Sequence, residues 1–319
     1  MQIYHQRRQQ LAQQLLPNSC VIIPSARETL RNGDTHYPFR QNSDFYYLTG
    51  FSEPDSFAVL RTRQTGEMEY ILFVRPNDVQ MEIWNGKRAG LEGACAEFGA
   101  NTAYSTAEFI TKLPELLRDQ QQIYYPFGHY AWFDELFLKE ITKLREARMQ
   151  LPAHVHDLHA VLSELRLYKT SEEIGLMQRA SDISAQAHIR GMQICKPNMF
   201  EYELAAEYLY YFTKEGGMGA AYPSIVAAGA NACTLHYTEN CAPMQDGDLI
   251  LVDAGAEYQY YGADITRTFP INGRFSAEQR AVYEIVLAAQ AAVIAALKPG
   301  IPFVTSQNIC TRVITEGLV

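Results

Sequence analysis

Residues 248–269 read DLILVDAGAEYQYYGADITRTF, and they decide the fold of the second half of the chain. The apolar run that follows Asp248 has the length of a strand, and the turn-forming Gln-Asp-Gly precedes it. A second strand is expected from about Gly262 through Phe269, with a short polar and aromatic turn between the two. The pattern predicts a β-hairpin whose first arm ends in Asp253-Ala-Gly255.

The two aspartates of this hairpin are the strongest candidates for chemistry. If the turn centres between Tyr258 and Gln259, Asp253 lies directly opposite Asp264, with the two Cβ atoms about 4.5–5.5 Å apart. Like charges at that distance repel, and aspartate is a poor strand residue. A pair of divalent metals bridged by carboxylates explains the arrangement, and hard oxygen ligands favour Mn(II), with Zn(II) or Co(II) as alternatives in mixed sites. The alternative is that each aspartate merely ends a strand or caps a turn.

Two further residues stand out by their type and place. His236 lies just upstream of the aspartates in the polar segment Thr234–Asn240, where it is a candidate proton donor or oxyanion stabiliser. The alternative is an ordinary packed or surface histidine. Trp84, in the segment Glu82–Gly86, reads by default as a core aromatic residue.

The first half of the chain has the alternating pattern of an α/β domain. Runs of strand length and helical patterns follow one another, with strands at 20–23, 56–60 and 69–74 and helices in the glutamine-rich opening, at 106–117 and at 133–148. Thr170 with Glu173 forms a capping-box signature that starts a long helix ending near Cys195. We therefore divide the chain into domains 1–168 and 169–319.

The residues before this boundary contain His154, His156 and His159, which form an H-x-H-x-x-H pattern. Imidazole is a common metal ligand, so a metal site is one interpretation. The favoured interpretation is a solvated linker or strand end, because Asp157 is the only carboxylate beside them.

Composition excludes several classes of protein. The 319 residues carry a net charge of −9 without a basic stripe, which argues against a nucleic-acid partner. The six cysteines form no C-x-x-C pair, and the opening lacks the apolar core of a signal peptide, so a cytoplasmic protein is expected. The apolar run 281–297 fits a buried helix better than a membrane span, so no membrane partner is expected.

The ordered set of motifs resembles the aminopeptidase P (Xaa-Pro aminopeptidase) family of pita-bread metallopeptidases over the whole chain. The matching segments are 42–54, 83–84, 165–174, the segment around His236, 252–255 and 264–269. This resemblance implies an α/β fold class, with an N-terminal α/β domain (a mixed sheet with flanking helices) followed by a pita-bread α+β catalytic domain.

The resemblance also implies a reaction and its residues. Family members release an N-terminal residue that precedes proline, by attack of a hydroxide that bridges two divalent ions, usually Mn(II). Asp253 and Asp264 match two of the five protein ligands, and His236 matches a histidine that hydrogen-bonds the substrate. Trp84 matches a tryptophan that reaches a neighbouring active site in a tetramer, and Arg166 matches a linker arginine of the active-site network.

The other three ligands of the family, one histidine and two glutamates, have no match in the chain. No histidine follows His236, and the carboxylates after Asp264 are Glu278, Glu284 and Glu316. We therefore expect a truncated, incomplete catalytic domain that is inactive alone and binds metal weakly or not at all. The alternatives are a prolidase that cuts Xaa-Pro dipeptides and a non-catalytic pita-bread module that binds peptides or proteins.

Overall fold

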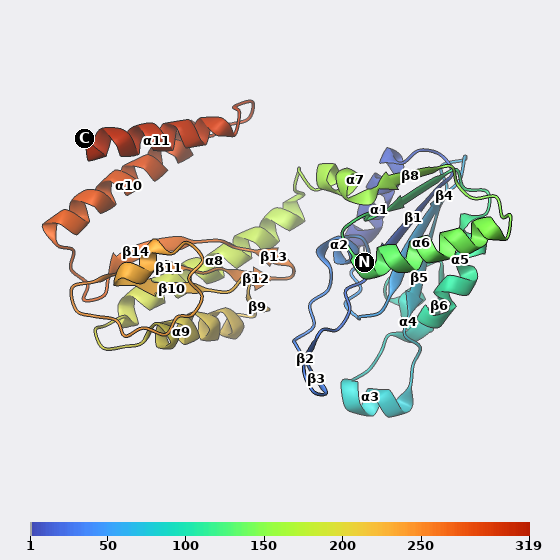
Figure 1. Cartoon of the computed structure of the whole chain (residues 1–319), viewed down its shortest axis with the longest axis horizontal. Coiled ribbons are helices and arrows are strands. Elements are labelled where there is room, and N and C mark those ends of the chain that lie inside the picture. Colours follow the sequence, from blue (N-terminus) through green and yellow to red (C-terminus); the bar gives the residue numbers. More distant parts are fainter. Residues whose placement is uncertain (1) are drawn as a thin grey trace. The chain divides into compact units, whose positions relative to one another are not determined.

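The computed structural model describes residues 2–319, and the chain divides into two compact units, 1–168 and 169–319 (Figure 1). The N-terminal unit contains a six-stranded mixed sheet in the order β6-β5-β4-β1-β7-β8. β4 pairs antiparallel with β1 and β5, whereas the other neighbours are parallel. The strands are β1 (Ser19–Pro24), β4 (Phe57–Thr62), β5 (Met68–Val74), β6 (Thr102–Ser105), β7 (Gln122–Tyr125) and β8 (His154–Asp157). The three strands predicted from apolar runs correspond to β1, β4 and β5.

Helices cover both faces of this sheet (Figure 1). Period-2 alternation along the strands sends neighbouring side chains to opposite faces, so two separate apolar clusters form. The first cluster lies under α1 (Gln2–Gln14), α2 (Ser43–Thr49), α4 (Gly90–Ala96) and α7 (Leu158–Leu165). The second lies under α5 (Phe109–Leu117), which the short helix η1 (Thr106–Glu108) precedes, and α6 (Ala131–Glu146). The predicted α/β domain is confirmed.

Three short elements of this unit contribute nothing to its core. They are the hairpin β2 (Leu30–Asn32) and β3 (Thr35–His36), which is exposed, and the helix α3 (Val79–Asn85), in which no residue is buried. Trp84 lies on α3 and is 84% exposed. The interpretation of Trp84 as a core aromatic is therefore wrong, because α3 packs no face against the sheet.

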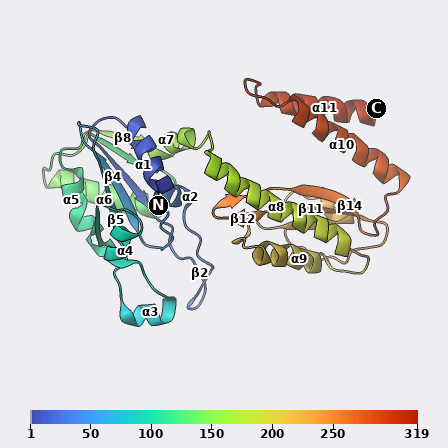
Figure 2. The same ribbon diagram turned by 180° about the vertical axis from the view of Figure 1, so that it is seen from behind.

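The C-terminal unit begins with α8 (Ser171–Ile194), whose predicted capping box between Thr170 and Glu173 is confirmed. Figure 2 shows α8 beside α9 (Glu201–Lys214), and both helices pack on the same side of two small sheets. One sheet is β10 (Ile225–Ala228), β11 (Leu249–Asp253) and β14 (Thr266–Pro270), in that order. The other is β13 (Tyr261–Gly262), β12 (Ala256–Tyr258) and β9 (Gly219–Ala220).

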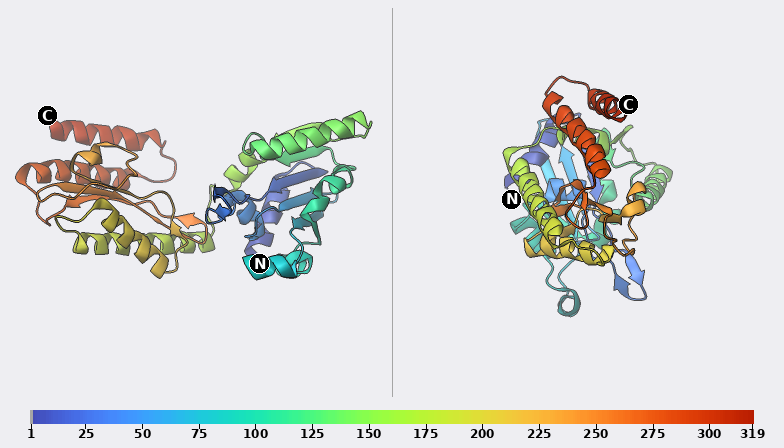
Figure 3. Two further views of the ribbon diagram at one scale, coloured as in Figure 1. Left: turned by 60° about the horizontal axis from the view of Figure 1, so that its bottom comes forward. Right: turned by 90° about the vertical axis from the view of Figure 1, so that its left-hand side faces the viewer.

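The last two helices, α10 (Ala277–Ala296) and α11 (Val304–Leu318), pair with each other on the opposite side of the sheets from α8 and α9 (Figure 3). A groove of about 760 Å³ separates α10 from β11 and β14. Ala289 is the one residue of α10 that is buried, so the prediction of a buried helix is wrong within this chain. Among the described helices, α10 alone is long and apolar enough to cross a membrane. This is weak evidence for a membrane span, because core helices of soluble proteins can have the same length and composition.

Candidate metal centre

The register of the predicted hairpin differs from the expected one by two residues. Tyr258 pairs with Tyr261, so the turn residues are Gln259 and Tyr260, at φ of 46° and 68°. Two consecutive residues with positive φ are what a type I′ turn requires, and its twist suits the flanking strands. Asp253 consequently pairs with Thr266 and not with Asp264. The expected direct opposition of the two aspartates is therefore wrong.

The two carboxylates nevertheless converge, since a shift by an even number of residues keeps each side chain on its face. They meet at the phenol of Tyr222, which lies in the loop between β9 and β10. Its hydroxyl is 2.5 Å from Oδ1 of Asp253 and 3.2 Å from Oδ1 of Asp264. One phenolic proton thus lies between two carboxylates that would otherwise repel each other.

Gly255 explains why the first arm of the hairpin ends in Asp-Ala-Gly. A Cβ atom at this position would lie 1.8 Å from the carbonyl oxygen of Ala263 and 3.1 Å from the amide nitrogen of Asp264. Only glycine lets the two backbones approach this closely. The motif therefore brings the second aspartate to the first, in addition to ending the strand.

Two side chains of helix α8 hydrogen-bond the backbone on either side of Gly255. Ser184 accepts a hydrogen bond from the amide of Ala256 at 2.8 Å. His188 is buried and lies 3.0 Å through Nε2 from the carbonyl oxygen of Ala254, while its Nδ1 lies 3.3 Å from the hydroxyl of Tyr208. Since a carbonyl can only accept, His188 donates through Nε2 and accepts the phenolic proton at Nδ1.

Burial governs the ionisation of both ring systems. Burial, reinforced by the hydrogen bond to Asp253, raises the pKa of Tyr222, so its phenol stays protonated near neutral pH. Burial also lowers the pKa of His188, which keeps this imidazole neutral and in the tautomer described above.

The neutral state of His188 predicts a pH-dependent stability. A histidine with a lowered pKa in the folded state contributes its full stability above the unfolded-state pKa of about 6.5. That contribution is lost as the pH falls from there through the lowered folded-state pKa. In urea unfolding at pH 8, we expect the free energy of unfolding of wild type to exceed that of His188→Gln by about 1–2 kcal/mol. At pH 5 we expect this difference in unfolding free energy to be smaller. A gap that stays constant between the two pH values would contradict the assignment.

The shared proton of Tyr222 predicts a second effect, on the metal-free protein. We expect Tyr222→Phe to lower the unfolding free energy by about 1.5–3 kcal/mol in the presence of a chelator, because a hydrogen bond to charged groups is lost. Mn(II) should narrow the difference, since a cation between the carboxylates relieves the same repulsion. Urea unfolding with chelator and with excess Mn(II) measures both values, and an equal loss in the two conditions would count against this account.

His236 lies in an exposed part of the segment between β10 and β11, and the residue after it, Tyr237, is buried. In residues 2–319 no hydrogen bond or ion pair joins its imidazole to either aspartate. His236 is therefore not a packed residue, and its exposure also fits an ordinary surface histidine. Its role as a proton donor or substrate ligand remains a prediction.

Arg166 and Trp84 belong to the N-terminal unit. Arg166 donates a hydrogen bond to Asp44 and lies 5.2 Å from the centre of the Tyr47 ring. His159 also faces Asp44, at 3.4 Å. Each of these contacts lies within the N-terminal unit, so the place of Arg166 in an active-site network remains a prediction, as does the substrate-binding role of Trp84.

The histidines before the boundary lie in β8 and in the first turn of α7. His156 contacts Oε1 of Gln122 at 2.8 Å and stacks on Tyr124, with ring centres 4.5 Å apart. Across residues 2–319, no group of three or more His, Cys, Asp or Glu side chains is placed to hold a metal ion. The favoured interpretation of the cluster as a strand end is therefore retained.

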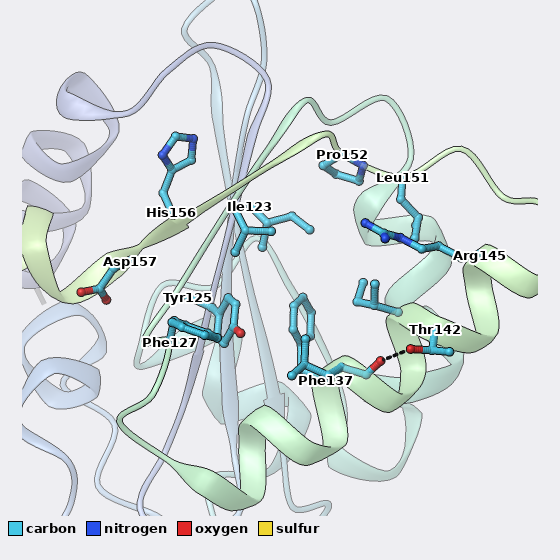
Figure 4. A pocket seen from close by; sticks show the side chains of 13 residues that line it. Ile123, Tyr125, Phe127, Phe137, Thr142, Arg145, Leu151, Pro152, His156 and Asp157 are labelled. Atoms are coloured by element: carbon cyan, nitrogen blue, oxygen red, sulfur yellow. Dashed lines mark hydrogen bonds between the residues drawn. The ribbon is translucent and has the colours of Figure 1, made fainter.

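A cavity of about 410 Å³ lies in the N-terminal unit beside α6 and the strands β7 and β8 (Figure 4). Its walls are mainly apolar, with Arg145 and Asp157 among the lining side chains. None of the five predicted site residues lines it. The cavity is therefore separate from the candidate metal centre.

Asp253 and Asp264 suit a hard divalent cation in type and placement. Their oxygens converge around a neutral phenol, and carboxylate oxygen is the donor that such cations prefer. Two carboxylates are fewer donors than a full coordination shell needs, so these residues make up part of a metal centre.

Comparison with known proteins identifies the family. The aminopeptidase P N-terminal domain matches residues 4–124, and metallopeptidase family M24 matches residues 175–319. The Xaa-Pro aminopeptidase of Haemophilus influenzae is 43% identical over 99% of this chain and 71% of its own length. The chain belongs to the Xaa-Pro aminopeptidases of metallopeptidase family M24. The resemblance found in the sequence is thereby confirmed.

Solved structures of Xaa-Pro aminopeptidases have the same fold. Proline aminopeptidase P II from Yersinia pestis superposes with a TM-score of 0.97 at 43% identity, covering 100% of this chain and 74% of that one. A zinc-substituted Escherichia coli aminopeptidase P in complex with product gives 0.97 at 40% identity, covering 100% and 73%. The predicted combination of an N-terminal α/β domain with a pita-bread domain is confirmed. As a member of family M24, the chain belongs to the metal-dependent hydrolases.

Proposed function

We propose that the protein releases the N-terminal residue from peptides whose second residue is proline, and that Mn(II) is its metal. The observation that carries the proposal is the convergence of Asp253 and Asp264 on one phenol, in a chain 40–43% identical to proteins named Xaa-Pro aminopeptidase. Both carboxylates offer the hard oxygen donors that suit Mn(II).

The residues of the candidate metal centre have different roles in the proposed reaction. Asp253 and Asp264 would hold the metal, which when bound lowers the pKa of water and polarises a carbonyl. Tyr222 holds the two carboxylates together and stays neutral. The exposed imidazole of His236 is free to hydrogen-bond the peptide. Because proline lacks an N–H, selectivity at the second residue has to come from the shape and apolar contacts of a pocket.

Further parts of the proposal concern assembly and location. We place the protein in the cytoplasm, which is supported by six cysteines without a disulfide in residues 2–319. We propose a homotetramer in which the exposed Trp84 contacts a neighbouring subunit or its substrate, supported by the unburied apolar surface of α3. Arg166 is proposed to belong to the network around the active site.

A substrate comparison tests the function. The relatives are longer than this chain, so the assay uses both the 319-residue chain and a version carrying the additional sequence of its relatives. With Mn(II), we expect the longer version to release the first residue from an Ala-Pro-Ala tripeptide and to release none from Ala-Ala-Ala. We expect the 319-residue chain alone to cleave neither peptide. Cleavage of the dipeptide Ala-Pro in preference to Ala-Pro-Ala would indicate a prolidase. Absence of cleavage of any of these peptides by the longer version would overturn the proposal.

A further inference from the structure

Glu201, the first residue of α9, holds a fully buried carboxylate with an unusual set of partners. Its exposure is 0%. Oε1 accepts hydrogen bonds from the amide of Ala228 at 2.7 Å and from Nδ2 of Asn231 at 3.0 Å. Oε2 accepts from the hydroxyl of Tyr237 and from the amide of Ala242, each at 2.8 Å. All four donors lie in one stretch of chain, 228–242.

This carboxylate forms no ion pair with a lysine or arginine anywhere in residues 2–319. Burying a carboxylate without a cation is costly unless hydrogen bonds replace its water shell, and here four of them do. A glutamine in the same place would turn one acceptor into an NH₂ group that points at two donors. The site therefore requires an acceptor-only side chain, which explains a charged residue where the first turn of a helix usually faces solvent.

The four hydrogen bonds hold the segment 228–242 at its start, middle and end. Asn240 is a second anchor, since it accepts from the amide of Val226 and donates to the carbonyl of Ser224, both at 2.8 Å. Between these ties the chain is exposed, with Leu235 at 89%. His236 lies in this exposed part, directly beside the anchored Tyr237.

We propose that Glu201 is a positioning residue that holds the segment 228–242 so that His236 is presented to the peptide substrate. Glu201 acts through Tyr237, whose buried hydroxyl anchors the residue next to His236 and leaves the imidazole in solvent. The anchoring of the segment depends only on the contacts described here. The identity of the ligand as a peptide rests on the proposed function.

The first experiment measures the segment itself by amide hydrogen exchange. We expect Glu201→Gln to lower protection of residues 228–242 at least tenfold, and Tyr237→Phe, which keeps the carboxylate, to lower it to a smaller extent. Glu173→Gln is the matched control, because Glu173 is also buried at the start of a helix and accepts a tyrosine hydroxyl, from Tyr261 at 2.6 Å. Unchanged protection in Glu201→Gln, or an equal loss in the Glu173→Gln control, would overturn the proposal.

The second experiment separates positioning from a general loss of structure. It measures kcat/KM in the version that carries the additional sequence of the relatives. If Glu201 acts through His236, Glu201→Gln lowers kcat/KM at least tenfold when His236 is present and less than twofold in the His236→Ala background. Glu173→Gln should change kcat/KM by the same factor in both backgrounds. Equal effects of Glu201→Gln in the two backgrounds would show a merely structural role. If the longer version without these substitutions cleaves no Xaa-Pro peptide, the proposed function fails, and hydrogen exchange still decides the role of Glu201 in the segment.

Discussion

Asp264→Ala is expected to weaken Mn(II) binding at least about 100-fold. Loss of a residue that only hydrogen-bonds a metal ligand already lowers metal affinity about 10–100-fold, and Asp264 is proposed to be a ligand itself. The remaining Asp253 would keep its contact with Tyr222, but one carboxylate cannot hold a divalent ion against water. Titration calorimetry on a version that carries the additional sequence of the relatives measures the change.

The matched control for this prediction is Asp246→Asn. Asp246 lies in the same unit, where it accepts an exposed hydrogen bond from Asn272 at 2.8 Å, and it takes no part in the carboxylate pair. Its replacement should leave Mn(II) affinity within about twofold of wild type. Equal losses in the Asp264 and Asp246 variants would show that the metal binds through general negative charge.

Gly255→Ala is expected to destabilise the C-terminal unit by about 3 kcal/mol or more, at the upper end of what overpacking usually costs. The added Cβ would lie 1.8 Å from the carbonyl oxygen of Ala263, and a backbone atom cannot move aside as a side chain can. The two arms of the hairpin must separate, which also moves Asp264 away from Asp253. Urea unfolding and Mn(II) titration of the same variant measure both effects.

Gly175→Ala is the control for the glycine prediction. Gly175 lies in α8, and a Cβ built there meets no atom within 4 Å. We expect this substitution to stabilise the protein by about 0.5–1 kcal/mol, because alanine loses less conformational entropy in a helix. A Gly255→Ala variant as stable as wild type would contradict the close approach of the two backbones.

The elements of the N-terminal unit were largely predictable because their apolar runs are long and bounded by turn residues. The hairpin was predictable in kind but not in register. Its turn, Gln259-Tyr260, lacks the Asn-Gly or Asp-Gly signal that locates a type I′ turn in a sequence. The observed register is shifted by two residues from the expected one, and an even shift keeps each side chain on its face of the hairpin. The expectation that Asp253 and Asp264 lie close together therefore still holds.

Other features depend on tertiary contacts that no local pattern encodes. Tyr222 is one of 20 tyrosines and lies 31 residues before the aspartate it contacts, so nothing local distinguishes it. Glu201 reads as an ordinary acidic residue in the first turn of a helix. For Trp84 and α10, the sequence predicts burial that the structure does not show. Apolar residues are buried only where another element packs on them, and the sequence does not reveal whether one does.

The central claim is that Asp253 and Asp264 together hold the divalent metal of an Xaa-Pro aminopeptidase. Anomalous diffraction at the manganese edge tests it most directly, from crystals of the version with the additional sequence of the relatives, grown with Mn(II). The predicted result is a manganese peak within bonding distance of both carboxylates, absent from crystals of Asp264→Ala. A map in which manganese binds elsewhere, or in which both carboxylates contact only Tyr222 at saturating Mn(II), would contradict the claim.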